Sequence, residues 1–254
     1  MLKRLREKIE SKRNSKNLFW KVLVFLKDFL WKIKNSIWEL SLYLKSRSAL
    51  KKLIKGKRVL IVGSGTSAKE LKEIPEDVLV FTCNAGLRLF YNKGYNKINL
   101  YLCHKRAIIY DYKDIKSLLK KIKCRVFVID EPGYIKKELG DSYSILIKDY
   151  NDNNYYLKRL IKPYNINQIK GSSALKSSSG MRLLQYALFF KAKEIYLIGI
   201  DVNEKGYFWG ERNEHKHLDI DRNLIKIVSK KYKNIYSVSK NSPITKFIPY
   251  KNLK

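Results

Sequence analysis

The chain has 254 residues, of which 45% are apolar and 13% aromatic, and its formal charge is +31. This length suits one domain with an appendage, and the apolar content excludes wholesale disorder. Three widely spaced cysteines, Cys83, Cys103 and Cys124, exclude a disulfide-built scaffold, and no Cys/His cluster offers a structural zinc site. We therefore expect a protein of the reducing cytosol.

The positive charge is concentrated at the start of the chain. Residues 1–58 hold 18 of the 54 basic residues but only 4 of the 23 acidic ones. A basic excess attracts phosphate-bearing partners such as nucleic acid, anionic lipid or nucleotides. The alternative interpretation is compositional drift, because Lys, Ile, Asn and Tyr are abundant together.

Residues 17–44 predict an amphipathic helix, because their apolar residues recur at spacings of three and four. Lysines interrupt these residues, so the segment lacks the apolar length that spans a bilayer, and it does not read as a signal peptide. Three of the four tryptophans, Trp20, Trp31 and Trp38, lie here among lysines. This combination is typical of helices that lie in the lipid interface.

We therefore expect residues 17–58 to hold the protein on an anionic membrane surface, as a peripheral protein on the inner face of the cell membrane. The alternative is a helix that packs on the domain or on a second subunit, which leaves a homo-oligomer open. The expected division is a basic amphipathic helical segment over residues 1–56 and a globular domain over residues 57–254.

The globular part alternates short apolar runs with helical patterns. The runs predict strands at residues 58–62, 78–83, 99–103, 125–129, 145–147, 194–200 and 234–238. Helical stretches are expected at residues 68–71, 112–122, 156–161, 180–190 and 220–232. This alternation predicts an α/β fold with a doubly wound, mostly parallel sheet. In such sheets ligands bind at the carboxyl ends of the strands, beside the point where the strand order reverses.

The first candidate site is the loop at residues 63–67, GSGTS, between a strand and a helical stretch. Its amides can cradle a phosphate, although it matches neither the GxGxxG pattern nor a P-loop. The alternative is a tight turn with Ser67 as helix cap. A second candidate is residues 176–180, KSSSG, where Lys176 adds a positive charge before another helix.

Two further candidates lie after the sixth expected strand. Asp201 directly follows its apolar run, although Asp is also common in turns. His215 and His217 are two of the three histidines in the chain, and histidine is the natural general base near neutral pH. The acidic pair at residues 219 and 221 can be read as a metal-binding DxD motif or as ordinary acidity at a helix start.

Taken together, six segments in order resemble the bacterial lipooligosaccharide sialyltransferases of glycosyltransferase family 42. The segments are residues 59–71 (VLIVGSGTSAKEL), 80–84 (VFTCN), 176–180 (KSSSG), 193–201 (KEIYLIGID), the histidine pair, and 234–244 (NIYSVSKNSPI). The resemblance implies a single Rossmann-like nucleotide domain with a small lid. It also implies transfer of sialic acid from CMP-sialic acid to a sugar hydroxyl, with inversion and without a metal or other cofactor.

The resemblance assigns three catalytic candidates. His215 falls at the position of the catalytic base, and a one-residue shift in the alignment favours His217 instead. Lys176 stands where the family has an arginine near the reacting centre. No residue is assigned to a metal.

The resemblance also assigns donor-binding positions. Gly63, Ser64, Gly65 and Ser67 correspond to the family's loop that contacts the CMP phosphate and ribose. Asn84 corresponds to an asparagine that contacts the donor, and Ser179 and Gly180 to the Ser-Gly pair that meets the nucleotide. Asp201 ends the equivalent strand. The family's two phosphate-binding tyrosines fall at Asn203 and at Tyr207 or Trp209, so at most one is kept. Ser64 and Cys103 stand where the family has asparagines.

These expectations describe an inverting, metal-independent glycosyltransferase with a CMP-activated donor of sialic acid or a related acid sugar. Its acceptor is a glycan or lipid-linked glycan of the bacterial cell surface. Because the residues that differ from the family fall on donor-binding positions, another nucleotide sugar remains an alternative as the donor. The alternatives from other classes are a basic nucleic-acid-binding protein, for which no known motif is found, and a membrane-bound scaffold without catalysis.

Overall fold

The computed structural model describes residues 18–111, 113–130, 139, 143–148, 177–203, 206–210 and 217–254. The chain divides into two compact units, Met1–Arg47 and Ser48–Lys254. The expected helix at residues 156–161 lies outside the described residues, as do Lys176 and His215.

The described part of the first unit is residues 18–47 of helix α2 (Leu18–Ile54), which confirms the predicted N-terminal helix and extends it by ten residues. The helix continues because its sequence contains no Gly or Pro before Gly56, which adopts the left-handed conformation that ends many helices. Its exposed apolar side chains follow helical spacing, at Val22, Phe25, Leu26, Phe29, Leu30 and Ile33. Among the described residues, no helix combines the length and apolar content needed to cross a bilayer.

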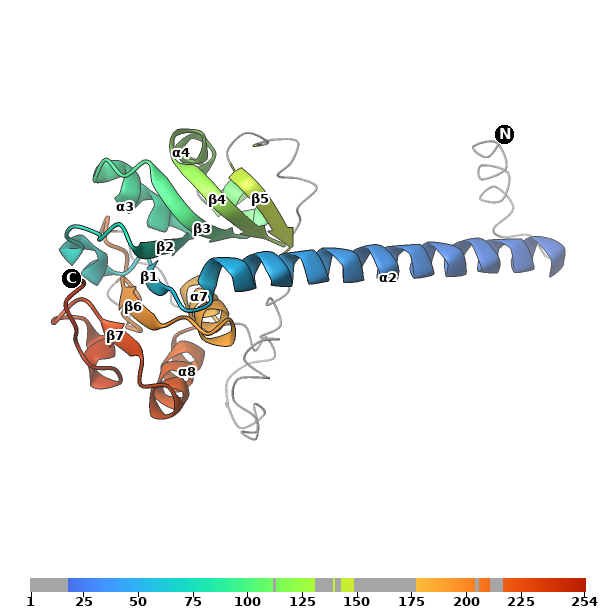
Figure 1. The fold of residues 1–254 in the computed structure, drawn as a ribbon. Coiled ribbons are helices and arrows are strands. Elements are labelled where there is room, and N and C mark those ends of the chain that lie inside the picture. Colours follow the sequence, from blue (N-terminus) through green and yellow to red (C-terminus); the bar gives the residue numbers. More distant parts are fainter. Residues whose placement is uncertain are drawn as a thin grey trace. The chain divides into compact units, whose positions relative to one another are not determined.

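The second unit contains a parallel sheet, drawn from blue-green to red in Figure 1. Its strands are β1 (Arg58–Val62), β2 (Val78–Cys83), β3 (Lys97–Cys103), β4 (Lys123–Ile129), β5 (Tyr143–Lys148), β6 (Glu194–Ile198) and β7 (Ile235–Ser237). All seven predicted strands are confirmed, and every strand pair in the described sheet is parallel.

The strand order is β5-β4-β3-β2-β1-β6-β7. The chain moves outward from β1 to β5 and then returns to place β6 on the other side of β1. The order therefore reverses between β1 and β6, and the crevice beside such a reversal is where doubly wound sheets bind ligands.

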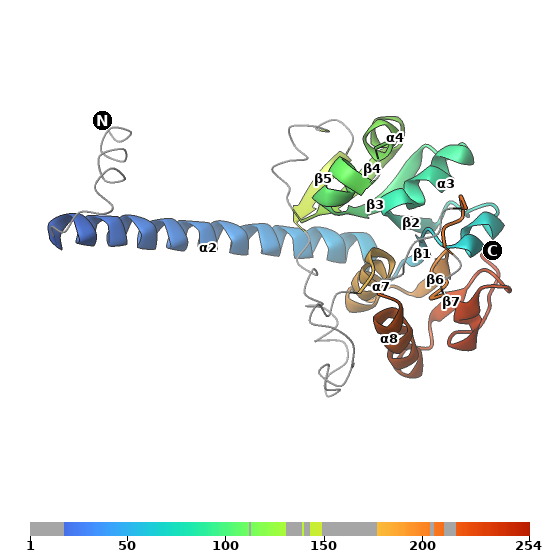
Figure 2. The same cartoon turned by 180° about the vertical axis from the view of Figure 1, so that it is seen from behind.

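Helices cover both faces of the sheet (Figures 1 and 2). On one face α7 (Ser179–Phe189), α8 (Leu218–Lys231) and the last turn of α2 share a core with alternate strand residues such as Val59 and Ile61. On the other face α3 (Leu87–Asn92) and α4 (Ile115–Lys121) pack on the intervening residues Leu60 and Val62. This two-sided burial explains the continuous apolar runs of the strands.

The predicted helices agree less closely with the structure than the predicted strands do. The predictions at residues 180–190 and 220–232 are confirmed by α7 and α8. The stretch at 68–71 is the 3₁₀ helix η1 (Thr66–Glu70), and the one at 112–122 shortens to α4. Helix α3 and the single π-turn η3 (Ala107–Asp111) were not predicted, since both are too short to show a helical period.

The division between the units comes nine residues before the expected boundary at residue 56. Leu50, Leu53 and Ile54, near the end of α2, are buried in the core that also includes residues of α7. This end of the helix therefore belongs to the α/β unit, and α2 enters that unit directly before β1.

Candidate functional site at the carboxyl ends of the strands

The predicted glycine loop leaves β1 beside the end of β6. The amide of Gly63 donates to the Ile198 carbonyl at 2.8 Å, and the amide of Gly65 donates to the Gly199 carbonyl at 2.7 Å. A Cβ atom on Gly63 would lie 2.3 Å from the Gly199 oxygen, and Gly199 itself has a φ of 68°. These glycines are therefore required by the close approach of two backbones, and the Gly65 amide is already used within the protein.

Asp201 fixes this loop in place. Its carboxylate, 4% exposed, accepts hydrogen bonds from the Ser67 amide at 2.8 Å, the Thr66 hydroxyl at 3.1 Å and the Ser242 hydroxyl at 2.8 Å. The Ser67 hydroxyl also donates to it and accepts from the Gly199 amide at 2.9 Å. Asp201 therefore ties together the loop after β1, the end of β6 and the chain near η6 (Pro243–Lys246).

Asn84 and Ser179, two predicted donor-binding residues from distant parts of the sequence, meet beyond the carboxyl end of β2. Asn84 follows β2 with a φ of 44°, and its side-chain Nδ2 donates to the Ser179 hydroxyl at 3.1 Å. Ser179 opens α7, whose cap is the Ser178 hydroxyl, which accepts from the Met181 amide at 3.3 Å. The Asn84 Oδ1 atom is buried and accepts no hydrogen bond from the described residues. Because an unmet buried acceptor is costly, this oxygen is suited to receive a donor group from a ligand.

A charged chain that the sequence did not predict lies beside this pair. Arg182, 2% exposed, hydrogen-bonds with His104 Nε2 and donates to the Ser179 hydroxyl at 3.2 Å. His104 Nδ1 lies 3.4 Å from Asp130 Oδ2, and Asp130 also accepts from the Lys105 amide at 2.9 Å. Since guanidinium only donates, His104 accepts at Nε2 and carries its proton at Nδ1, toward Asp130. The available signal was positional, because His104 and Asp130 directly follow β3 and β4.

Asp221 supports the start of α7 from α8. Its buried carboxylate accepts from the Ser178 amide at 3.0 Å. Burial raises its pKa to about 7, although the hydrogen bonds from Ser178 and the charge of Arg182 favour the ionised form. Asp219 and Asp221 both lie in the first turn of α8, where acidic residues are common. Within the described residues no group of three potential metal ligands is found.

A segment rich in aromatic residues contacts the glycine loop through its backbone. The Phe208 amide donates to the Ser64 carbonyl at 2.9 Å, and Tyr207 forms a backbone bridge with Gly65. The rings of Tyr207 and Trp209 are stacked with centroids 4.3 Å apart, and the Arg88 guanidinium lies 4.7 Å from the Trp209 ring centre. The structure thus brings predicted residues Ser64, Gly65 and Tyr207 together.

The positions of the remaining predicted residues reveal less about function. Asn203 is half-buried five residues after β6 ends, and Gly180 lies in the first turn of α7, where a Cβ would come within 3.1 Å of Ile200. His217 is half-buried at the residue before α8, and its carbonyl accepts from the Asp221 amide at 2.9 Å. The assignment of the base to His215 or His217 therefore stays a prediction.

Comparisons with known proteins address the fold. No protein-family model matches the sequence, and no curated protein matches it. The solved sialyltransferase CstII from Campylobacter jejuni, in complex with the substrate analogue CMP-3FNeuAc, is 24% identical, with a TM-score of 0.55 over 78% of this chain and 87% of that chain. The sialyltransferase CST-II in complex with a trisaccharide acceptor and CMP is 23% identical, with the same score and coverage.

The chain has the fold of these sialyltransferases. The monofunctional α-2,3-sialyltransferase Cst-I from Campylobacter jejuni also matches, with 19% identity and a TM-score of 0.54 over 77% of this chain and 80% of that chain. These matches confirm the fold that the sequence motifs implied. At this level of identity they establish the fold, and the activity is argued from the site.

Proposed function

We propose that this protein is a glycosyltransferase that takes a sugar from a CMP-activated donor, sialic acid or a related acid sugar, and transfers it to a glycan or lipid-linked glycan. The observation that carries the proposal is the Asn84–Ser179 pair, with its unpartnered buried oxygen, at the reversal of the strand order. The structural neighbours with CMP and with a trisaccharide acceptor support the classes of donor and acceptor.

The arrangement accounts for donor binding in physical terms. Asn84 Oδ1 is placed to accept from an amino or hydroxyl group of the donor, while the Asp201 network holds the glycine loop rigid. The segment that carries the stacked rings of Tyr207 and Trp209 forms a backbone bridge to that loop at Gly65. A rigid site of this kind orders its donor at low entropic cost.

The proposed reaction is an inverting displacement. His215, or His217 in its place, takes the proton of the acceptor hydroxyl as its oxygen attacks the anomeric carbon of the donor. The bond between that carbon and the phosphate oxygen breaks, and CMP leaves with the electron pair. Lys176 and Tyr207 stabilise the phosphate by charge and hydrogen bonding, so the proposal includes no metal.

The same proposal places the protein on the inner face of the cell membrane, where lipid-linked acceptors such as lipooligosaccharide precursors are built. The exposed side chains of Val22, Phe25, Leu26, Phe29, Leu30 and Ile33 support this attachment. Their spacing gathers them on one face of α2, and Phe25 and Phe29 stack with ring centroids 6.1 Å apart.

The test is CMP binding to the full-length protein, measured by titration calorimetry without metal. We expect Asn84→Ala to weaken CMP binding about tenfold or more, because a buried polar contact is lost. Thr82→Ser, which changes a buried side chain near the same strand end but keeps its hydroxyl, serves as the control. Binding of UDP with Mn²⁺ in place of CMP would keep the transferase and reject the CMP donor. Binding of neither nucleotide would reject the proposal.

A further inference from the structure

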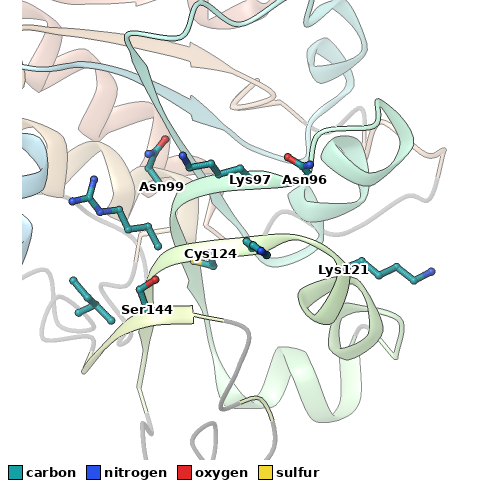
Figure 3. Close-up of a pocket in the computed structure, with 9 residues that line it drawn as sticks. Asn96, Lys97, Asn99, Lys121, Cys124 and Ser144 are labelled. Atoms are coloured by element: carbon teal, nitrogen blue, oxygen red, sulfur yellow. The ribbon is translucent and has the colours of Figure 1, made fainter.

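The amino ends of the strands form the other edge of the sheet, and this edge carries a basic hollow. The hollow has a volume of about 640 Å³ and lies where β3, β4 and β5 begin (Figure 3). Lys97, Lys121, Lys123 and Arg125 line it, and its nine lining residues include no acidic side chain. Lys97, Lys123 and Arg125 are exposed, and no described carboxylate forms an ion pair with them.

Two of these lysines are set against each other. Lys97 on β3 and Lys123 on β4 are register partners in adjacent strands. Like charges directly opposite one another destabilise a sheet, so this arrangement costs stability. An anion bound in the hollow removes that repulsion, and fold stability alone gives no reason to keep the pair.

The basic character extends to other parts of this edge, whereas Glu76 and Asp77 precede β2. Exposed lysines precede three other strands, at Lys51, Lys52, Lys55 and Lys57 before β1, Lys191 and Lys193 before β6, and Lys230, Lys231 and Lys233 before β7. Two of the acidic residues on the edge are neutralised by neighbours, because Arg58 pairs with Asp77 at 3.0 Å and with Glu194 at 3.5 Å.

We propose that this amino edge of the sheet is a docking surface for an anionic lipid bilayer, with the hollow between β3, β4 and β5 receiving acidic head groups. The inference goes beyond the transferase activity, because it concerns the edge of the sheet opposite to Asn84 and the glycine loop. β4 is seven residues long, so the two edges are separated by about 23 Å along its strand. That distance exceeds two Debye lengths at physiological salt, so charges at the two edges act independently.

Two observations favour lipid over nucleic acid. None of the nine described residues that line the hollow is aromatic, whereas single-stranded nucleic acid is usually held by rings that stack on bases. In addition, α2 enters the α/β unit at this edge through its last turn, and the same helix exposes a stripe of apolar side chains. The basic edge therefore follows, in the chain, a helical segment with exposed apolar side chains, a feature of helices that bind membrane surfaces.

The test is sedimentation of the full-length protein with vesicles of phosphatidylcholine containing roughly one third phosphatidylglycerol. We expect Lys97→Glu/Lys123→Glu/Arg125→Glu to lower the partition coefficient at least roughly 100-fold, since each basic residue near such a surface contributes about fivefold and the new carboxylates add repulsion. The matched control reverses the same number of charges at the carboxyl edge, in Lys69→Glu/Lys240→Glu/Lys246→Glu, and should change partitioning less than about threefold because of screening.

A single variant keeps the test independent of folding. Lys97→Glu places opposite charges on the register partners of β3 and β4, so we expect it to raise the melting temperature while it lowers vesicle binding. Equal binding by the edge variant and wild type would overturn the proposal, as would equal losses in the edge variant and the control. Loss of single-stranded RNA binding with vesicle binding retained would also overturn it. None of these measurements depends on sugar transfer, so failure of the transferase proposal remains separate.

Discussion

The two edges of one sheet use polar side chains in opposite ways. At the carboxyl edge Asp201, Arg182 and Asp221 are buried and make hydrogen bonds with described residues. At the amino edge Lys97, Lys123 and Arg125 are exposed and are not paired with described carboxylates. Buried, directional bonds give a rigid site with a defined shape, whereas exposed charge gives attraction without shape. The difference suits selective recognition of a small molecule at one edge and adhesion to a charged surface at the other.

The largest expected effect tests the rigidity of the carboxyl edge. Asp201→Ala should lower the free energy of unfolding by about 3–5 kcal/mol, because it leaves several buried donors without an acceptor. Urea denaturation measures this change. Asp219→Ala, which removes an exposed carboxylate from the first turn of α8, should cost less than about 1 kcal/mol. Similar losses in both variants would show that Asp201 does not organise this edge.

The next effect tests the proposed transfer chemistry. His215→Ala should lower the transfer rate about 10²–10⁴-fold, because it removes the proposed base, while CMP binding stays within about twofold. The rate of sugar transfer from CMP-sialic acid, with CMP affinity measured in parallel, checks this. His217→Ala is the matched control and should keep most of the activity; the reverse pattern would assign the base to His217.

The last effect concerns the titration of Asp221. Burial raises its pKa from 3.8 to about 7, so the folded state favours the protonated acid. Its contribution to stability is therefore fully present below about pH 4 and is lost as the pH rises through about 7. Asp221→Asn cannot ionise, so the stability of the wild type relative to this variant should fall between these pH values, by an amount of the order of a few kcal/mol.

Urea denaturation across this pH range measures the Asp221 effect. Asp219→Asn, at an exposed position two residues earlier, provides the control and should show no such trend. A constant difference between the wild type and Asp221→Asn would mean that water reaches this carboxylate. The carboxyl edge would then be less closed than its hydrogen bonds indicate.

Strands were predicted more completely than helices for a physical reason. Each strand is a continuous apolar run because both of its faces are covered, so the signal is contained in neighbouring residues. α3 spans only six residues, less than two turns, and its sequence shows no helical period. The extension of α2 into the core depends on Leu50, Leu53 and Ile54 finding the sheet, which adjacent residues do not reveal.

Prediction of the candidate site was limited in the same way, because neighbouring residues do not reveal distant contacts. The glycine loop, Asn84 and the start of α7 were predicted from motifs and their order, and the structure places them around one reversal of the sheet. The role of Asp201 as a bond acceptor for the loop was not predicted, because its partners lie about 130 residues earlier and 41 residues later in the chain.

The sequence by itself determined the alternation of strands and helices, the class of fold and the long N-terminal helix, because apolar periodicity acts between residues close in the chain. Only the tertiary structure decided which polar groups meet: Asn84 with Ser179, Arg182 with His104, and Lys97 with Lys123. These pairings depend on strand order and register. Order and register are set by burial of the whole sheet between two layers of helices, an energy to which no short segment contributes alone.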